Sequence, residues 1–126
     1  MFCHDASRYC LFLPGLRKPQ FAELGERWFR SLYLASLAAL GSSDALVGRA
    51  GLALGPIRFD TATDRSVQGS LNIARQDLNA KVMRVANVME LDPVAIACRL
   101  NHRPATVYGK LVWPDRAMLE AIASLA

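Results

Sequence analysis

The segment from residue 64 to residue 85 has the clearest periodicity in the chain. Its apolar residues recur at steps of four, three, four, four and three, which a helix satisfies and a strand does not. They are Val67, Leu71, Ala74, Leu78, Val82 and Val85. Thr63 or Asp64 can cap the start of this helix. Gly69 disfavours a helix by about 1 kcal/mol relative to alanine, so we expect it to mark a close helix crossing.

The opposite face of this predicted helix is polar. It carries Arg65, Gln68, Asn72, Arg75, Gln76 and Asn79. A solvated surface explains such a face, but amide and guanidinium groups also suit contacts to phosphate groups or to a peptide backbone. The candidate binding residues are therefore Asp64, Arg65, Gln68, Asn72, Arg75 and Asn79.

The first 41 residues predict a hairpin followed by a helix. Residues 1–13 alternate around a turn at residues 5–7, which would place Cys3 and Cys10 opposite each other. Pro19 suits the first position of a helix, and Gly41 is a natural stop. The second half of this helix, residues 31–40, is apolar on almost every side, so we expect it to be buried centrally or against a partner.

Shorter elements fill the rest of the chain. We expect a helix at residues 44–49, capped by Ser42 or Ser43, and a strand at 56–61. A further helix should begin at Asp92, and a strand should follow at 107–113 with Trp113 in the core. The last helix should begin at Pro114, with Met118, Leu119, Ile122 and Leu125 facing inward. The predicted fold class is α+β. Residues 1–126 form a single domain, in which a small, mainly antiparallel sheet packs against two longer helices and short C-terminal helices.

Composition restricts the possible functions. The net charge is +4, but the basic residues are spread from Arg8 to Arg116 without a cluster, so an acidic partner is permitted and not required. The longest apolar run, at residues 32–40, is interrupted by Ser36 and falls far short of the roughly 20 residues that a membrane span needs. The first residues lack the features of a signal peptide. We therefore expect a cytoplasmic protein that makes no membrane contact.

No catalytic or metal-binding pattern is present in the sequence. The three cysteines match no zinc spacing, and the two histidines lack a nearby acid–cysteine or acid–serine pattern. We expect no metal and no cofactor. Asp60 and Asp64 flank the turn before the long helix, and with Arg65 and Asn72 they could form a polar pocket. A helix cap for Asp64 and a salt bridge for Asp60 explain the same two acids without a function.

Two phrases in the chain resemble a known family. They are Phe12-Leu-Pro-Gly-Leu-Arg-Lys18, followed by Phe21 and Leu24-Gly-Glu26, and Thr63-x-Arg65-Ser-Val-x-Gly69-Ser-x-Asn72. Together they resemble DUF6933, a family of small bacterial proteins of unknown function, over about residues 1–85. The resemblance implies an α+β fold and no catalytic residues. It draws attention to Arg65, Ser66, Gly69, Ser70 and Asn72.

The same resemblance bears on assembly. Members of the family generally carry further strands before the hairpin, whereas this chain starts almost at it. An open strand edge invites pairing with another chain. Together with the apolar helix at residues 31–40, this predicts a homodimer.

The functional prediction is a non-enzymatic binding or interaction module, of mobile-element or phage-related origin, with a protein or nucleic-acid partner. One alternative is a small hydrolase or transferase that uses Asp60, Asp64, Arg65 and Asn72. Another is a nucleic-acid-binding accessory protein.

Overall fold

The computed structural model describes residues 1–15, 18–21, 23–55 and 64–125. In chain order the elements are β1 (Phe2–Cys3), β2 (Cys10–Leu11), α1 (Lys18–Phe21), the π-helical segment η1 (Leu24–Phe29), α2 (Arg30–Ala39), α3 (Asp44–Ala53), α4 (Arg65–Val82), the 3₁₀ turn η2 (Val88–Glu90), α5 (Pro93–Asn101), β3 (Ala105–Val107), β4 (Lys110–Val112) and α6 (Pro114–Ala123). The strand predicted at 56–61 lies outside the described residues, as do Asp60 and Thr63.

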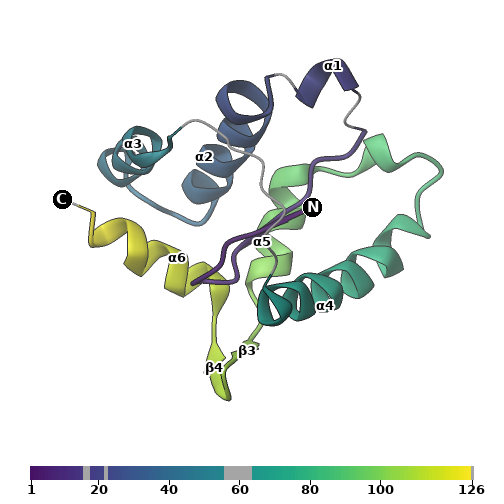
Figure 1. The fold of residues 1–126 in the computed structure, drawn as a ribbon. Coiled ribbons are helices and arrows are strands. Elements are labelled where there is room, and N and C mark those ends of the chain that lie inside the picture. The colour runs from purple at the N-terminus through teal and green to yellow at the C-terminus, as the bar shows by residue number, and fades with distance from the viewer. Residues whose placement is uncertain (16–17, 22, 56–63, 126) are drawn as a thin grey trace.

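The β1–β2 hairpin crosses the middle of the molecule, with α2 and α3 on one side and α4 on the other (Figure 1). Helix α5 contacts α2, α4, α6 and β2, so it is the central helix of the structure. The β3–β4 hairpin projects at the lower end in Figure 1. None of the helices in the described part of the chain is long and apolar enough to cross a membrane.

The predicted N-terminal hairpin is confirmed. Strands β1 and β2 are antiparallel, and Cys3 lies opposite Cys10. On β2 the N–H and C=O of Cys10 both bond to the side chain of Asn101, and β1 lies against α4. Arg8, in the turn, has a positive φ of 61°, which is uncommon outside glycine and asparagine.

The helix predicted from Pro19 to Gly41 is present but interrupted. The amide of Trp28 donates to the carbonyl of Glu23, five residues earlier, which is the π-helical register. The extra residue in that turn rotates the buried face, so Ser36 is buried and Ala35 is exposed. Gly41 ends the helix with φ 91°.

The apolar half of this helix is covered by its own chain. Leu32 and Leu37 are buried in the larger core cluster with residues of β2, α3, α5 and α6. Of residues 31–40, those exposed are Ser31, Ala35, Ala38 and Ala39, which are small. The structure thus accounts for the apolar half of the helix within one chain. The homodimer stays a prediction.

Helix α3 begins where predicted and runs further. Ser43 accepts a hydrogen bond from the amide of Leu46, so Ser43 is the cap, and the helix continues to Ala53 instead of ending near residue 49. Arg30 of α2 donates to the carbonyl of Gly51 at 2.7 Å. A Cβ at Gly51 would lie 2.9 Å from the guanidinium of Arg30, so glycine permits this close approach.

The long helix α4 follows the predicted pattern. Asp64 is its cap, since one carboxylate oxygen accepts from the amides of Ser66 and Val67 at 2.8 and 3.2 Å. Ala74 and Leu78 are buried in the second core cluster, with Cys10, Ile96 and Leu100. The close helix crossing expected at Gly69 is wrong, because a Cβ there would meet no atom within 4 Å.

The C-terminal region differs from the prediction at one element. In place of one strand at residues 107–113, β3 and β4 form an antiparallel hairpin. Tyr108 and Gly109 make its turn with φ values of 49° and 79°, the signs required by a type I′ turn. The alternating pattern does not reveal this turn because a tyrosine occupies a position that usually takes asparagine or glycine. Trp113 is only half-buried and packs against His102 and Arg116.

The helices on either side of this hairpin are confirmed. Asp92 caps α5 through the amide of Val94. In α6, Met118 and Ile122 are buried and Leu119 packs against the core, as does Leu125 just after the helix. The α+β class is confirmed, although the described strands form two separate two-stranded sheets and not one.

Candidate functional site

A cleft of about 290 Å³ opens where the turn of the first hairpin, the first turns of α4 and the β3 region meet. This end of the molecule is the lower one in Figure 1. The residues lining the cleft are Arg8, Cys10, Arg65, Ser66, Gly69, Ser70, Ile73, Ala74, Leu100, Arg103, Pro104, Ala105, Thr106 and Pro114. Three arginines are among them and, of the described residues, no acidic one, so we call this the arginine cleft.

Arg8 is the unusual residue of the arginine cleft. Its side chain is buried, with the residue only 2 % exposed. One terminal nitrogen donates to the hydroxyl of Ser66 at 2.7 Å, and the other donates to the carbonyl oxygen of Asp5. Its Nε is buried and has no hydrogen-bond partner among the described residues. None of the ion pairs found in that part of the chain includes Arg8.

A buried guanidinium without a carboxylate is energetically costly, by several kcal/mol when nothing compensates the charge. The two hydrogen bonds of Arg8 go to neutral oxygens, so they satisfy N–H groups without neutralising the charge. The positive φ of Arg8 adds backbone strain at the same residue. Strained backbone and buried charge are both typical of binding sites.

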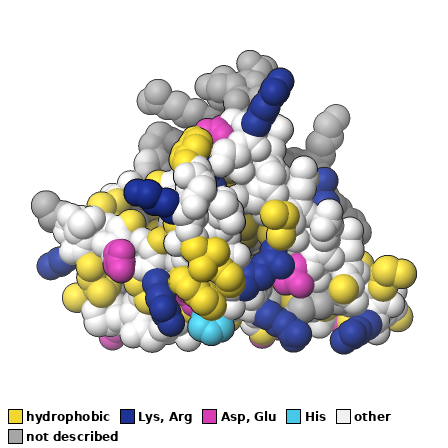
Figure 2. Space-filling view, turned by 90° about the horizontal axis from the view of Figure 1, so that it is seen from below, with side chains coloured by type: hydrophobic (Ala, Val, Ile, Leu, Met, Phe, Trp, Pro, Cys, Tyr) yellow, Lys and Arg dark blue, Asp and Glu magenta, His cyan; other side chains and the backbone are white. Residues whose placement is uncertain are grey.

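The other cations and the hydroxyl groups surround Arg8. Arg65 is exposed at the start of α4, and Arg103 follows α5. Arg103 forms an ion pair with Asp77 at 3.3 Å, so its charge is partly compensated. Ser66 and Ser70 lie one turn apart on α4, and both line the cleft. Lys and Arg side chains are spread over the lower end of the molecule, with Asp or Glu side chains interspersed among them (Figure 2).

Of the predicted binding residues, the structure places one in the arginine cleft and the others outside it. Asp64, Arg65, Gln68, Asn72, Arg75 and Asn79 are all exposed on or beside α4. Arg65 is the member that lines the arginine cleft. Asp64 is occupied as the helix cap. The pocket expected from Asp60, Asp64, Arg65 and Asn72 is not assembled by the residues described, since Asp64 and Asn72 do not line the cleft and Asp60 lies outside them.

Sequence reasoning missed Arg8 and Arg103. Arg8 lies in a hairpin turn, where a charged residue is ordinarily solvated, so its position carries no signal of burial. The family resemblance was more informative. Of the five residues to which it drew attention, Arg65, Ser66, Gly69 and Ser70 line the arginine cleft, and Asn72 does not.

An acid–histidine pair was also missed. Nδ1 of His102 lies 2.8 Å from a carboxylate oxygen of Asp115, whose side chain is largely buried. Cys98 lies one helical turn before His102 on α5. Burial raises the pKa of the Cys98 thiol, so Cys98 is held as a thiol and not as a reactive thiolate. These three residues therefore do not have the properties of a cysteine–histidine nucleophile.

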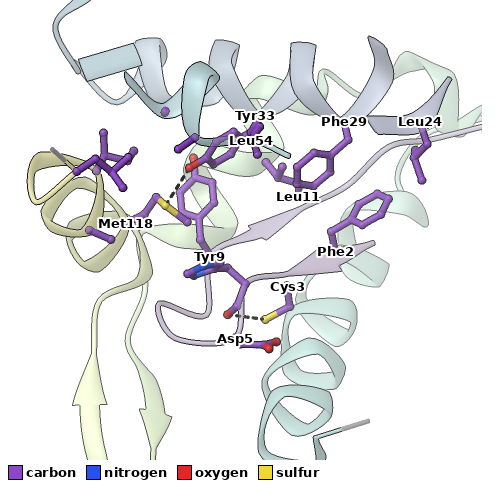
Figure 3. A pocket seen from close by; sticks show the side chains of 16 residues that line it. Phe2, Cys3, Asp5, Tyr9, Leu11, Leu24, Phe29, Tyr33, Leu54 and Met118 are labelled. Atoms are coloured by element: carbon purple, nitrogen blue, oxygen red, sulfur yellow. Dashed lines mark hydrogen bonds between the residues drawn. The ribbon is translucent and has the colours of Figure 1, made fainter. Parts of the chain in front are cut away.

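A larger, mainly apolar groove of about 770 Å³ lies on the other side of the hairpin (Figure 3). Phe2, Leu11, Phe29, Tyr33 and Met118 point into it. The hydroxyl of Tyr33 donates to the sulfur of Met118 at 3.3 Å. Burial raises the pKa of the Tyr33 hydroxyl, so it stays neutral.

Within the described residues, no group of three or more His, Cys, Asp or Glu side chains is placed to hold a metal ion. All three cysteines are free thiols.

Comparison with known proteins agrees with the resemblance seen in the two sequence phrases. A family model described as a domain of unknown function, DUF6933, matches residues 1–117. A search of curated proteins found no match, and a search of solved structures found none. Because the family model covers far more than half of the sequence, the chain belongs to the DUF6933 family.

Proposed function

We propose that this protein is a non-enzymatic binding module that binds a phosphate group in the arginine cleft. The observation that carries the proposal is Arg8, a buried guanidinium with a free N–H and no carboxylate partner among the described residues. A bound anion would neutralise this charge. It would also accept the hydrogen bond that Nε does not make, and charge-assisted hydrogen bonds of this kind are the stronger ones.

The surroundings of Arg8 favour phosphate as the anion. Ser66 and Ser70 supply hydroxyl donors, and Arg65 supplies a second guanidinium. The N-terminal end of α4 contributes the positive end of a helix dipole, although the Asp64 carboxylate offsets part of it. The volume of about 290 Å³ is at the small end of the range for ligand sites, so it suits one phosphate-sized group and its immediate attachment.

The hydrolase or transferase alternative has less support. A hydrolytic site needs a group that activates water, and among the described residues no Asp, Glu or His lines the arginine cleft. Asp64, the acid on which that alternative depended, uses one carboxylate oxygen to cap α4. Binding without chemistry requires only the cations and hydroxyl groups that are present.

The phosphate group could belong to a small molecule or to a nucleic acid. The exposed polar face of α4, from Arg65 to Asn79, continues away from the cleft and would lie beside a longer ligand. Inorganic phosphate and a short single-stranded oligonucleotide therefore serve as two probes of one site. If the partner is a nucleic acid, affinity falls steeply with salt, because phosphate contacts release counterions.

The test is calorimetric titration of the full chain with inorganic phosphate, repeated with the oligonucleotide. Saturable phosphate binding that is weakened at least tenfold by Arg65→Gln supports the proposal. The matched control is Arg75→Gln, which removes an exposed arginine of the same helix that does not line the cleft. Equal losses in both variants would indicate a general charge effect and would overturn the assignment of the cleft, as would the absence of binding.

Assembly is a separate part of the proposal. The homodimer and the mobile-element or phage-related origin stay predictions. Light scattering at micromolar concentration tests the dimer, and a monomer mass would refute it.

A further inference from the structure

Cys3 and Cys10 lie directly opposite each other in the β1–β2 hairpin. Both backbone groups of Cys10 point outward, since its N–H donates to Oδ1 of Asn101 at 2.6 Å and its carbonyl accepts from Nδ2 of Asn101 at 2.8 Å. The two cysteines therefore form a non-hydrogen-bonded cross-strand pair. In such pairs the Cα atoms are about 4.5 Å apart and the side chains are at their closest. That separation lies within the range that a disulfide spans.

The two thiols differ in exposure and in acidity. Cys3 is half-buried and lines the larger apolar groove, whereas Cys10 is only 4 % exposed. Hydrogen bonding between the two side chains lowers the pKa of Cys3, with a further contribution from the charge of Arg8. The same hydrogen bond, together with burial, raises the pKa of Cys10. A lowered pKa beside a second cysteine is expected of an attacking thiol, so Cys3 is the attacking member of the pair.

We infer that Cys3 and Cys10 form a redox-active pair, in which a peroxide oxidises Cys3 and Cys10 then closes a disulfide across the hairpin. The Cys3 thiolate attacks one peroxide oxygen, the O–O bond breaks, and the departing oxygen leaves as water or an alcohol after taking up a proton. Cys3 becomes a sulfenic acid. The sulfur of Cys10 attacks that of Cys3, the S–O bond breaks, and water leaves with the Cys10 proton. Two electrons pass from the thiols to the peroxide.

The fold holds Cys10 in position for the second step, its attack on the oxidised Cys3. Asn101, fully buried, holds the backbone of Cys10 through both hydrogen bonds, so the resolving thiol stays opposite Cys3. Cys10 also donates weakly to the carbonyl of Arg8 at 3.4 Å, and the disulfide removes this donor. Closure therefore ties together the two ends of the turn that carries Arg8.

The test uses the full chain, equimolar hydrogen peroxide, alkylation of the remaining thiols and digestion with trypsin. Trypsin cleaves after Arg8, which lies between the two cysteines, so a disulfide joins peptide 1–8 to peptide 9–17. The expected product is this linked pair, lighter than its parts by two hydrogen atoms and separated by a reductant. Cys98 is expected to be recovered alkylated.

Variants locate each step. Cys98→Ser should give the same linked peptides, because Cys98 takes no part. Cys10→Ser should stop at a sulfenic acid on Cys3, which dimedone traps. The inference is overturned if the wild-type chain gives no linked peptides, if it gives only disulfides between chains or to Cys98, or if dimedone labels Cys98 in place of Cys3. The wild-type result alone decides the pairing, so the test does not depend on a variant that folds poorly.

Discussion

The carboxamide of Asn101 pairs with the backbone of Cys10 as a neighbouring strand would. Oδ1 accepts from the Cys10 amide at 2.6 Å, and Nδ2 donates to the Cys10 carbonyl at 2.8 Å and to the carbonyl of Ala97 at 2.7 Å. One side chain thus attaches the end of α5 to β2 and satisfies two backbone groups that would otherwise be buried without partners.

This pairing predicts a large effect of a small substitution. Asn101→Leu keeps the approximate volume but leaves the N–H and C=O of Cys10 unpaired, so the free energy of unfolding should fall by about 2–4 kcal/mol. Urea denaturation measures the change. Asn79→Leu, at an exposed position of α4, is the matched control and should change the free energy by no more than about 0.5 kcal/mol. Equal effects of the two substitutions would contradict the structural role of Asn101.

The arginine cleft predicts a stabilisation that depends on phosphate. Low millimolar phosphate should raise the Tm above its value in sodium chloride of equal ionic strength, because a ligand that binds only the folded state stabilises it. The rise should saturate and should disappear in Arg8→Gln, whereas a general salting effect grows steadily with concentration. Arg8→Gln should also raise the Tm without phosphate, since it removes an uncompensated buried charge. A phosphate effect that Arg8→Gln leaves intact would place the anion elsewhere.

At Gly69 we expect a substitution to stabilise the protein. It lies inside α4 with φ in the helical range, and a Cβ would meet no atom within 4 Å. Gly69→Ala should therefore raise the free energy of unfolding by about 0.5–1 kcal/mol through helix propensity alone. Gly51→Ala is the contrasting variant, because its Cβ would lie 2.9 Å from the Arg30 guanidinium and displace it from the Gly51 carbonyl. A loss of stability in Gly69→Ala would show that this residue is needed for close contact.

The buried hydroxyl of Tyr9 should make the free energy of unfolding depend on pH in the alkaline range. Burial raises the pKa of its hydroxyl, which donates to Ser36 at 2.8 Å, above the ordinary value of 10.0. The unfolded chain ionises near pH 10 while the folded chain keeps the proton, so the stabilisation is complete below pH 10 and is lost as the pH rises further. Denaturation of Tyr9→Phe between pH 8 and 11 should show a shallower decline than the wild type. Parallel declines would mean that Tyr9 is not the group responsible.

Local patterns in the sequence were sufficient to predict α4, to limit its cap to Thr63 or Asp64, and to place the start of α5 at Asp92. Each depends on residues within one or two helical turns, and helical periodicity and capping act over that distance. The same reasoning placed Cys3 opposite Cys10, because a short turn determines the register of a hairpin. It did not detect the π-helical turn at Trp28, because residues 31–40 are apolar on almost every side and so do not reveal the shift of the buried face.

The candidate site was decided by the tertiary structure. Arg8 and Ser66 are 58 residues apart in sequence, and Asn101 and Cys10 are 91 apart. No local rule relates residues at such separations, because their contact depends on how α4 and α5 pack around the hairpin. The sequence by itself determined where α4, α5 and α6 lie and that the first residues form a hairpin. Only the packing of these elements buried Arg8 without a carboxylate partner among the described residues and placed it in one cleft with Arg65, Ser66 and Arg103, because burial is a property of the assembled core and not of any one segment.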